Sequence, residues 1–415
     1  MRKNNIRFTG IEIGTYSIKA VQADILPDNS INILGGIEKK TSGSVIKGRI
    51  VDTLAIEDKL RSMLAELENS TREEIGDIIF ATTGSHIRVA DKMGIVSVNS
   101  QDGRITEEDL DRAREFAGNN PASPEEHILH FIDKRYSIAE QKQEVQNPIG
   151  IVANSLSVDV HIVYGDTNTL KTTATIIEEI MGKPPADIAL TSVADAFALL
   201  KTEDREGGVL FINMGEGVTD YTIFRGVGCI SSGILSIGCQ NVVNDLAIGL
   251  ELSMSKCRKL FEEDGSAIAT GEEELVYLDV DNNLHVARSS IEQIMELRLR
   301  EILEEIKIDL TKNTDISLLC NKVILVGGGA QIKNIRKLAR DVFYMPVHVA
   351  TPRDMELVNN ISDEINNPRF VTPVALIRYA GNMSNLQSYE PSSLWEQFKK
   401  DLKDAIILIK RSLNL

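Results

Sequence analysis

Three glycine-rich turns, each directly after a strand-like run, constrain the fold of this chain most strongly. They occupy residues 10–15 (GIEIGT), 213–217 (NMGEG) and 326–330 (VGGGA). Glycine tolerates positive φ and leaves backbone N–H groups accessible to an anion, so such turns can hold the phosphates of a nucleotide. A single turn of this kind is more often an ordinary tight turn, because short motifs carry a false-positive risk. Together, the three turns predict one nucleotide site built from distant parts of the chain.

The pattern of strand, glycine turn and strand over residues 7–23 is repeated over residues 208–224. Two halves that each begin with such a hairpin predict a duplicated α/β architecture with a cleft between the halves. The sequence pattern changes over residues 85–165, where alternating β runs surround one acidic helix. This pattern predicts a small α+β insert. Hydrophobic periodicity predicts helices at residues 54–67, 107–116, 167–181, 188–200, 241–250, 253–263, 290–310, 331–342 and 372–380.

Composition excludes several classes of protein. The 415 residues carry 45 basic and 61 acidic side chains, for a net charge of −16, and a general nucleic-acid binder needs a basic face instead. The four cysteines form no CxxC pair or zinc spacing, which is typical of a reducing compartment. No stretch approaches the roughly 20 apolar residues that span a bilayer, so we expect any membrane contact to be peripheral. The chain also contains no GxxxxGK[ST] motif, which excludes a P-loop enzyme.

Five segments, in order, resemble the actin, hexokinase and sugar-kinase superfamily of ATP-binding proteins and, within it, the FtsA family of bacterial division proteins. Residues 10–15 and 213–220 are similar to the two phosphate hairpins, residues 326–331 to the adenosine motif, and residues 188–200 and 370–376 to the two connecting helices. The resemblance covers nearly the whole chain. It implies an α/β fold of the actin, hexokinase and chaperone ATPase type, with two lobes, an α+β insert of the 1C type and a C-terminal amphipathic helix.

The resemblance also implies a division of the chain into subdomains. Subdomain 1A would comprise residues 1–84, 166–205 and 368–385, and residues 85–165 would be subdomain 1C. Subdomain 2A would comprise residues 206–240 and 315–367, and residues 241–314 would be subdomain 2B. Residues 381–393 would form a tether and residues 394–415 an amphipathic helix.

A nucleotide site follows from the same resemblance, with ATP and Mg²⁺ as the expected ligands. The expected phosphate-binding residues are Gly14, Thr15, Tyr16, Asn213, Gly215, Glu216 and Gly217. The expected adenosine-binding residues are Lys259, Gly327, Gly328, Gly329 and Ala330, and the expected magnesium residues are Glu12 and Asn213.

Two residues of the second turn depart from the family pattern. Asn213 stands where most members of the superfamily carry aspartate, and Glu216 stands where the family usually has glycine. An asparagine supplies only a neutral carbonyl and cannot accept a proton from water near neutral pH. The resemblance therefore leaves enzymatic activity open: we expect ATP to bind and its hydrolysis to be slow or absent, and we assign no catalytic residue.

The end of the chain has the pattern of a helix that lies in a membrane interface. Residues 391–415 carry five basic and three acidic side chains, or +2. Apolar side chains fall within an arc of about 120° with lysines beside it, as in an interfacial helix with snorkelling lysines. The stripe and its lysines are Leu394, Trp395, Phe398, Leu402, Ala405, Ile406, Ile409, Leu413, Lys399, Lys403 and Lys410. The alternative is a terminal helix that docks on the body or on another protein.

The FtsA resemblance implies partners and a location. It implies a homo-polymer, an actin-like protofilament on anionic lipid at the cytoplasmic face of the bacterial inner membrane, at the division site, which anchors FtsZ. The C-terminal peptide of FtsZ would meet the long helix that carries Arg298, Arg300 and Lys307, and other division proteins would meet the 85–165 insert. The three cations can instead pair with glutamates of their own helix at i,i+4 spacing.

Two rival functions remain open on the sequence. A scaffold like the pilus-assembly protein PilM, which binds a short peptide of an inner-membrane partner, has no reason to carry its own amphipathic anchor. A small-molecule kinase of the same superfamily is disfavoured by Asn213.

Overall fold

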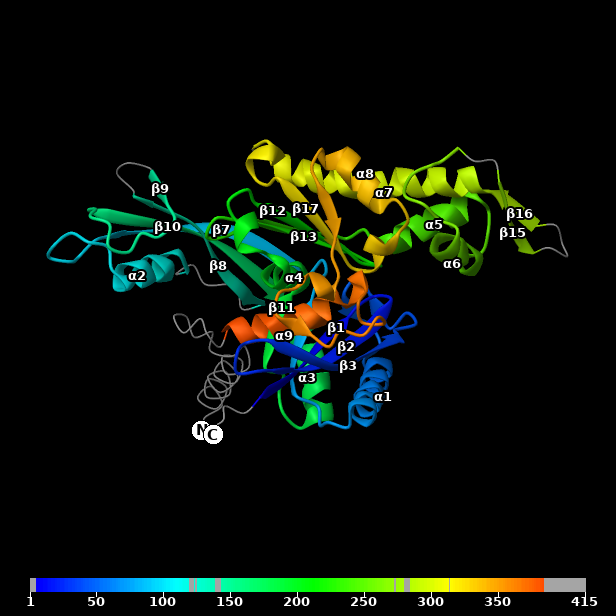
Figure 1. Ribbon diagram of the computed structural model, residues 1–415, viewed down its shortest axis with the longest axis horizontal. Coiled ribbons are helices and arrows are strands. Elements are labelled where there is room, and N and C mark those ends of the chain that lie inside the picture. The colour runs from blue at the N-terminus through cyan, green and yellow to red at the C-terminus, as the bar shows by residue number, and fades with distance from the viewer. Residues whose placement is uncertain are drawn as a thin grey trace, which may run out of the picture.

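The chain folds into two lobes and a third unit that projects to one side, as the ribbon in Figure 1 shows. This computed structural model describes residues 5–118, 123, 125–138, 143–271, 274–279, 284–312 and 314–383. The predicted helix at 394–415 and most of the predicted tether at 381–393 lie outside the described residues.

A six-stranded sheet in the order β11-β6-β1-β2-β3-β19 forms the centre of the first lobe. β1 and β2 are an antiparallel hairpin around the first glycine turn, and β1 pairs in parallel with β6. Every residue of β2 is buried, which places this strand in the core of the lobe. The strands and helices are β1 (Ile6–Ile13), β2 (Ser17–Ile25), β3 (Ile31–Lys40), α1 (Thr53–Thr71), β6 (Asp77–Thr82), α3 (Thr167–Met181), β11 (Asp187–Leu190) and β19 (Val358–Asn359). A short hairpin, β4 (Val45–Ile46) and β5 (Arg49–Ile50), lies between β3 and α1.

The second lobe repeats this plan around a five-stranded sheet in the order β14-β13-β12-β17-β18. β12 and β13 are an antiparallel hairpin around the second glycine turn, and β12 pairs in parallel with β17, which enters the third. The predicted duplicated architecture is therefore confirmed. The strands are β12 (Val209–Met214), β13 (Thr219–Arg225), β14 (Gly228–Leu235), β15 (Leu275–Asp279), β16 (Leu284–Ala287), β17 (Lys322–Val326) and β18 (Val347–Val349). The helices are α5 (Cys239–Gly249), α6 (Met254–Glu263), α7 (Arg288–Thr311) and α8 (Ile335–Phe343).

The α+β insert is confirmed as a separate four-stranded antiparallel sheet in the order β7-β10-β8-β9, with one helix, α2, packed on it. Its elements are β7 (Ile87–Ser97), α2 (Glu107–Gly118), β8 (Glu126–Ile138), β9 (Gln143–Val145) and β10 (Ser155–Asp166). Although both ends of the insert join the first lobe, its sheet also contacts β14 of the second lobe. His161 Nε2 lies 2.7 Å from Ser232 Oγ, and a Cβ on Gly228 would lie only 1.8 Å from the Asp133 carbonyl oxygen.

Two helices that we call the hinge helices cross between the lobes: α4 (Thr191–Leu199) and α9 (Val371–Met383) (Figure 1). Ala194, Ala196 and Ala375 are fully buried at 0% exposure. Small side chains allow the two helices to approach closely, which domain closure around a hinge requires.

Two sequence predictions about element bounds were wrong. Residues 188–190 extend β11 in parallel to β6, and the helix begins only at Thr191; a short apolar run does not distinguish a buried strand from a helix. Residues 328–331 form a 3₁₀ turn, and α8 begins at Ile335 after Asn334 in a left-handed conformation (φ 64°). β19 pairs in parallel with β3, so Val358 and Asn359 join the sheet of the first lobe, while the predicted division into subdomains stays a prediction.

Among the described residues, none of the helices combines the length and the apolar character that crossing a bilayer requires.

Candidate functional site

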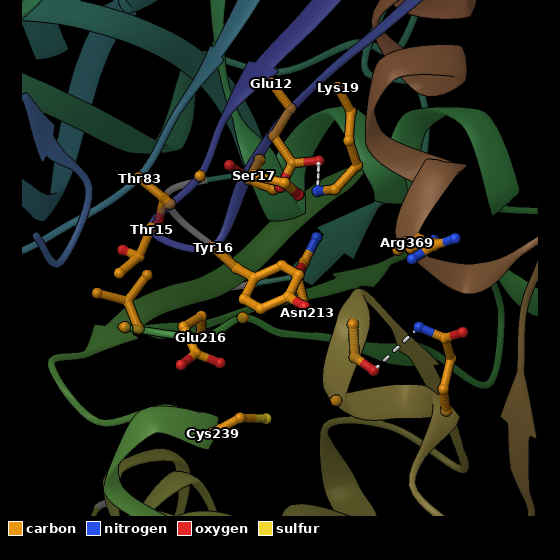
Figure 2. A pocket seen from close by; sticks show the side chains of 18 of the residues that line it. Glu12, Thr15, Tyr16, Ser17, Lys19, Thr83, Asn213, Glu216, Cys239 and Arg369 are labelled. Atoms are coloured by element: carbon orange, nitrogen blue, oxygen red, sulfur yellow. Dashed lines mark hydrogen bonds and ion pairs between the residues drawn. The ribbon is translucent and has the colours of Figure 1, made fainter. Parts of the chain in front are cut away.

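The three glycine turns meet at one cavity of about 350 Å³ between the lobes. Figure 2 shows Glu12 and Lys19 on one side of it and Glu216 and Cys239 on the other. The predicted residues in its wall are Glu12, Gly14, Thr15, Tyr16, Asn213, Gly215, Glu216, Gly217, Gly328 and Gly329. Gly327, Ala330 and Lys259 are not part of this wall. The structure therefore brings together ten of the predicted nucleotide-site residues and leaves three behind or outside the wall.

The first two turns have the same internal geometry. In each, a glycine donates its backbone N–H to the carbonyl three residues later, Gly14 to Ser17 at 3.0 Å and Gly215 to Val218 at 3.0 Å. The two turns also touch, since a Cβ on Gly217 would lie 2.6 Å from Thr15 Oγ1. Two such turns face to face create a concave set of backbone groups that suits a polyphosphate.

The third turn provides a surface without side chains. Gly327 has φ 86°, and a Cβ there would lie 2.4 Å from Asn213 Oδ1, so this residue fixes the approach of the third turn to the second. At Gly328 a Cβ would meet no atom within 4 Å, although the residue lines the cavity. A flat nucleoside could lie against this backbone, because no side chain occupies the space above it.

Charged side chains of the first lobe are paired with one another along the cavity. Lys19 Nζ lies 2.8 Å from Glu12 Oε2. Glu38 accepts a hydrogen bond from Ser17 Oγ at 2.6 Å and lies 3.0 Å from Arg369 Nη1. The Glu12 carboxylate is therefore already neutralised by a lysine in this arrangement.

Asn213 ties the second turn to both hinge helices. Its side-chain amide donates to Asp195 Oδ2 of α4 at 2.7 Å and to Thr372 Oγ1 of α9 at 3.0 Å. Asp195 is completely buried, and burial raises the pKa of its carboxyl group well above the usual value. Asn213 therefore donates a hydrogen bond to a buried carboxyl group. An aspartate at position 213 could form a hydrogen bond with Asp195 only if one of the two carboxyl groups were protonated.

Asp220 supplies a second carboxyl group that the sequence analysis did not assign. It lines the cavity, is 1% exposed, and accepts the backbone N–H of Ser192 at 2.9 Å. Burial raises the pKa of Asp220 to about 7, and the Glu12 carboxylate adds to the shift. A carboxyl group with such a pKa can take up or release a proton near neutral pH.

The residues present fit a magnesium ion held partly by phosphate. Within the described part of the chain, no group of three His, Cys, Asp or Glu side chains is placed to hold a metal on its own. Mg²⁺ usually binds one or two carboxylates together with substrate phosphates and waters. Glu12, Asp220 and the Asn213 carbonyl all face the same cavity and could act in that way.

Helix α6 presents Arg258, and not Lys259, to the cavity. Arg258 forms an ion pair with Glu216, with Nη1 3.1 Å from Oε2, and donates to Gln240 Oε1 at 2.7 Å. The Lys259 side chain is 67% exposed and pairs with Glu263 at 3.8 Å. Arg258 is therefore the cation of α6 that lines the cavity. The adenosine contact predicted for Lys259 stays a prediction.

Tyr16 reaches across the cleft from the first lobe to the second. Its hydroxyl donates to Glu262 Oε1 of α6 at 3.2 Å, and the Arg258 guanidinium lies 5.7 Å from its ring. The lobes are therefore bridged at the mouth of the cavity.

Sequence reasoning missed several residues of the site, among them Asp220 and Arg258 in the cavity wall and Asp195, which accepts a hydrogen bond from Asn213. One signal was present for Asp195: an aspartate in the middle of an otherwise apolar helix is almost never fully buried unless it is paired. No sequence signal reveals the ion pair of Arg258, because Glu216 lies 42 residues away.

We expect Asn213→Asp to lower the free energy of unfolding by about 3–5 kcal/mol at pH 8, since it places a second carboxylate against buried Asp195. Each carboxyl raises the pKa of the other, so the folded state binds protons more tightly than the unfolded chain, and stability is lost as pH rises through the folded pKa. Urea unfolding at pH 5.5 and pH 8 measures the difference. Asp195→Asn in the same chain should restore most of the loss; equal losses at both pH values would contradict the account.

The cations predicted to receive a partner peptide all have partners within the fold. Arg298 pairs with Asp245 at 2.5 Å and Glu301 at 2.6 Å, and Arg300 pairs with Glu296 at 2.7 Å. Lys307 donates to the Val342 carbonyl at 2.8 Å and lies 4.7 Å from the Tyr344 ring. Their role in peptide binding stays a prediction.

Comparison with known proteins identifies two family models along the chain. The model described as "Cell division protein FtsA" matches residues 210–375, and that of the "SHS2 domain inserted in FTSA" matches residues 84–164. The proteins named "Cell division protein FtsA" include that of Borreliella burgdorferi, 27% identical over 89% of this chain and 90% of the relative. That of Bacillus subtilis is 26% identical over 92% and 86%, and that of Escherichia coli K12 is 23% identical over 91% and 90%.

Solved structures share the fold at low sequence identity. One chain of the PilM–PilN type IV pilus biogenesis complex superimposes with a TM-score of 0.63 at 15% identity, covering 90% of this chain and 98% of the other. MreB5 of Spiroplasma citri bound to ADP superimposes with a TM-score of 0.54 at 13% identity, covering 92% and 99%. These likenesses confirm the actin-like fold.

Proposed function

Because the chain belongs to the FtsA family of cell division proteins, we propose that it binds ATP, polymerises into actin-like protofilaments and anchors FtsZ to the inner membrane face. The meeting of three glycine turns at one cavity between the lobes carries the nucleotide part of this proposal. The solved structure of similar fold that is bound to ADP agrees with a nucleotide as ligand.

In the proposed complex the first and second turns hold the phosphates, and the bare backbone of Gly328 and Gly329 receives the nucleoside. Lys259, Gly327 and Ala330 remain proposed adenosine-side residues. Mg²⁺ would bind Glu12 and the Asn213 carbonyl, together with phosphate oxygens. Because Glu12 is paired with Lys19 and Asn213 is neutral, we propose slow or absent hydrolysis.

Attachment to the membrane is proposed from the sequence of residues 394–415 alone. Each apolar side chain contributes roughly 1.5–3 kcal/mol at full burial and less at an interface, so attachment by one helix is reversible. Assembly into a filament multiplies the number of anchors and strengthens binding through avidity. The proposed location is therefore the cytoplasmic face of the inner membrane at the division site, with the 85–165 insert available to other division proteins.

A scaffold like PilM is the second candidate, favoured by the TM-score of 0.63. The two proposals differ in their partners: FtsZ for the first, and a peptide of an inner-membrane protein for the second. The chain matches FtsA family models over both the second lobe and the insert, which favours the first.

Recruitment of FtsZ to lipid tests the proposed function. Purified protein on anionic vesicles should carry FtsZ into the pellet, and Arg298→Glu should reduce the pelleted FtsZ at least about tenfold, because it reverses a charge offered to an acidic peptide. Arg61→Glu is the matched control, since Arg61 pairs with Glu57 on the exposed face of α1. Recruitment that is unaffected by Arg298→Glu would move the peptide site elsewhere; no recruitment by the wild type would reject the FtsZ role.

A further inference from the structure

The β4–β5 hairpin brings a lysine to the place where the two phosphate turns touch. A Cβ on Gly217 would lie 3.1 Å from both the backbone nitrogen and the Cα of Lys47. Lys47 is the first residue of the hairpin turn and has φ 48°, a left-handed conformation that is unusual for lysine. With Gly48 at φ 80°, it forms the two-residue turn between β4 and β5, a turn type that requires positive φ at both positions.

Beyond this contact lies a second cavity of about 470 Å³. Thr15, Tyr16, Glu216, Gly217 and Arg258 line both cavities, so the phosphate turns form the partition between them. A group bound in the second cavity would therefore lie next to the phosphate end of a nucleotide bound in the first.

The charge of the second cavity is opposite to that of the chain. Its lining contains three cations, Lys40, Lys47 and Arg258, against one carboxylate, Glu216, for a balance of +2 in a protein of net charge −16. The cavity thus concentrates positive charge beside residues of the two phosphate turns, and a concave site of positive charge attracts oxyanions.

The donors of this cavity are only partly used. Within the described chain, the Lys47 side chain has no hydrogen bond or ion pair, and the Lys40 ammonium lies 5.1 Å from the centre of the Tyr16 ring. Asn241 Oδ1 accepts the Gly238 N–H at 3.1 Å, and Asn244 Oδ1 accepts from Gln240 at 2.9 Å. These two bonds engage the amide oxygens, so both NH₂ groups can donate to a ligand.

We propose that the second cavity is a binding site for one phosphate group, with Lys40 and Lys47 as its principal ligands and Arg258 shared with the nucleotide cavity. The phosphate could be free inorganic phosphate or the terminal phosphate of the nucleotide, since both present the same oxygens. That the phosphate would lie next to a bound nucleotide rests on the proposed function, which places ATP in the first cavity. The binding of free phosphate in the second cavity does not depend on that proposal.

Equilibrium dialysis of full-length protein with radiolabelled inorganic phosphate tests the site. Without nucleotide we expect about one phosphate per chain, and a loss of affinity of at least about tenfold in each of Lys47→Gln and Lys40→Gln, because each removes a charge-assisted contact. Both lysines are exposed, so the variants should fold normally. Lys183→Gln, which removes a lysine that pairs with Asp77 on the outside of the first lobe, should leave phosphate binding unchanged.

Repeating the dialysis with ADP and with ATP distinguishes the two sources. Phosphate that stays bound beside ADP but is displaced by ATP identifies the terminal phosphate as an occupant of the same site; phosphate that stays bound beside both identifies free phosphate as the ligand. Absence of phosphate binding, affinity unchanged in both lysine variants, or displacement by chloride at equal ionic strength would overturn the proposal. If the protein bound phosphate but no nucleotide, the nucleotide part of the proposed function would fail while the phosphate site stood.

Discussion

Replacing Gly217 with valine is expected to abolish the binding of ATP. Gly217 is the point where the turns of the two lobes touch, and even a Cβ there would lie 2.6 Å from Thr15 Oγ1 and 3.1 Å from the backbone of Lys47. The Thr15 side chain can rotate away from the new Cβ. The backbone of the β4–β5 hairpin at Lys47 can move away only if the contact between the two phosphate turns opens. The branched side chain would force the turns apart and remove the backbone groups proposed to hold the phosphates.

Titration of a fluorescent ATP analogue measures this effect. Gly217→Ala should lose at least about tenfold in affinity, since separating the turns removes charge-assisted hydrogen bonds to phosphate, and Gly217→Val should give no measurable binding. Gly118→Ala is the control. Gly118 is the last residue of α2, and a Cβ there would make only an ordinary contact of 3.4 Å with the Phe131 ring. Wild-type affinity in Gly217→Val would mean that the nucleotide does not bind between these turns.

Deleting residues 391–415 is expected to move the protein from the pellet to the supernatant when it is centrifuged with anionic vesicles. The deletion removes the apolar stripe and all five basic residues of the tail, and with them both the hydrophobic and the electrostatic attraction to the surface. Affinity for ATP should be unchanged, because the cavity wall in the described part of the chain is formed by residues between Glu12 and Arg369.

Two comparisons make this deletion informative. Vesicles of neutral lipid should bind the wild type more weakly than anionic ones, and added salt should release it, since part of the attraction is electrostatic. Vesicle binding that persists after the deletion would show that another surface of the protein meets the membrane. Loss of ATP affinity in the truncated chain would instead support the alternative, a tail that docks on the body.

The geometry around Asn213 suggests how the cavity and the hinge are connected. One side chain in the second turn donates to α4 through Asp195 and to α9 through Thr372. A ligand that moves the second turn must therefore move or break contacts with both hinge helices. The neutral amide donates both of these hydrogen bonds, whereas a carboxylate could not donate to Asp195, so Asn213 stabilises the connection between the second turn and the two helices.

The parts of the site that were predictable from sequence are local. Each glycine turn is encoded within a few residues, and the repetition of strand, turn and strand at 7–23 and 208–224 was enough to predict two lobes with a cleft. Backbone groups at such turns need no particular side chain, so their role can be inferred without knowing the rest of the fold.

The parts that were not predictable depend on distant contacts. Arg258 lines the cavity because of how α6 packs, and its partner Glu216 lies in the turn between β12 and β13. Lys259, one position further along the helix, faces away, which a rotation of about 100° per residue explains. Residues 188–190 became a strand because β6 offered a parallel edge, and no pattern within the segment indicates that edge.

Electron microscopy of the purified full-length protein on anionic lipid monolayers tests the central claim most directly. We expect filaments with an actin-like longitudinal repeat in the presence of ATP, few or none without it, and FtsZ recruited to the monolayer only where this protein is present. A monolayer that carries the protein with ATP but shows neither filaments nor FtsZ would contradict the account.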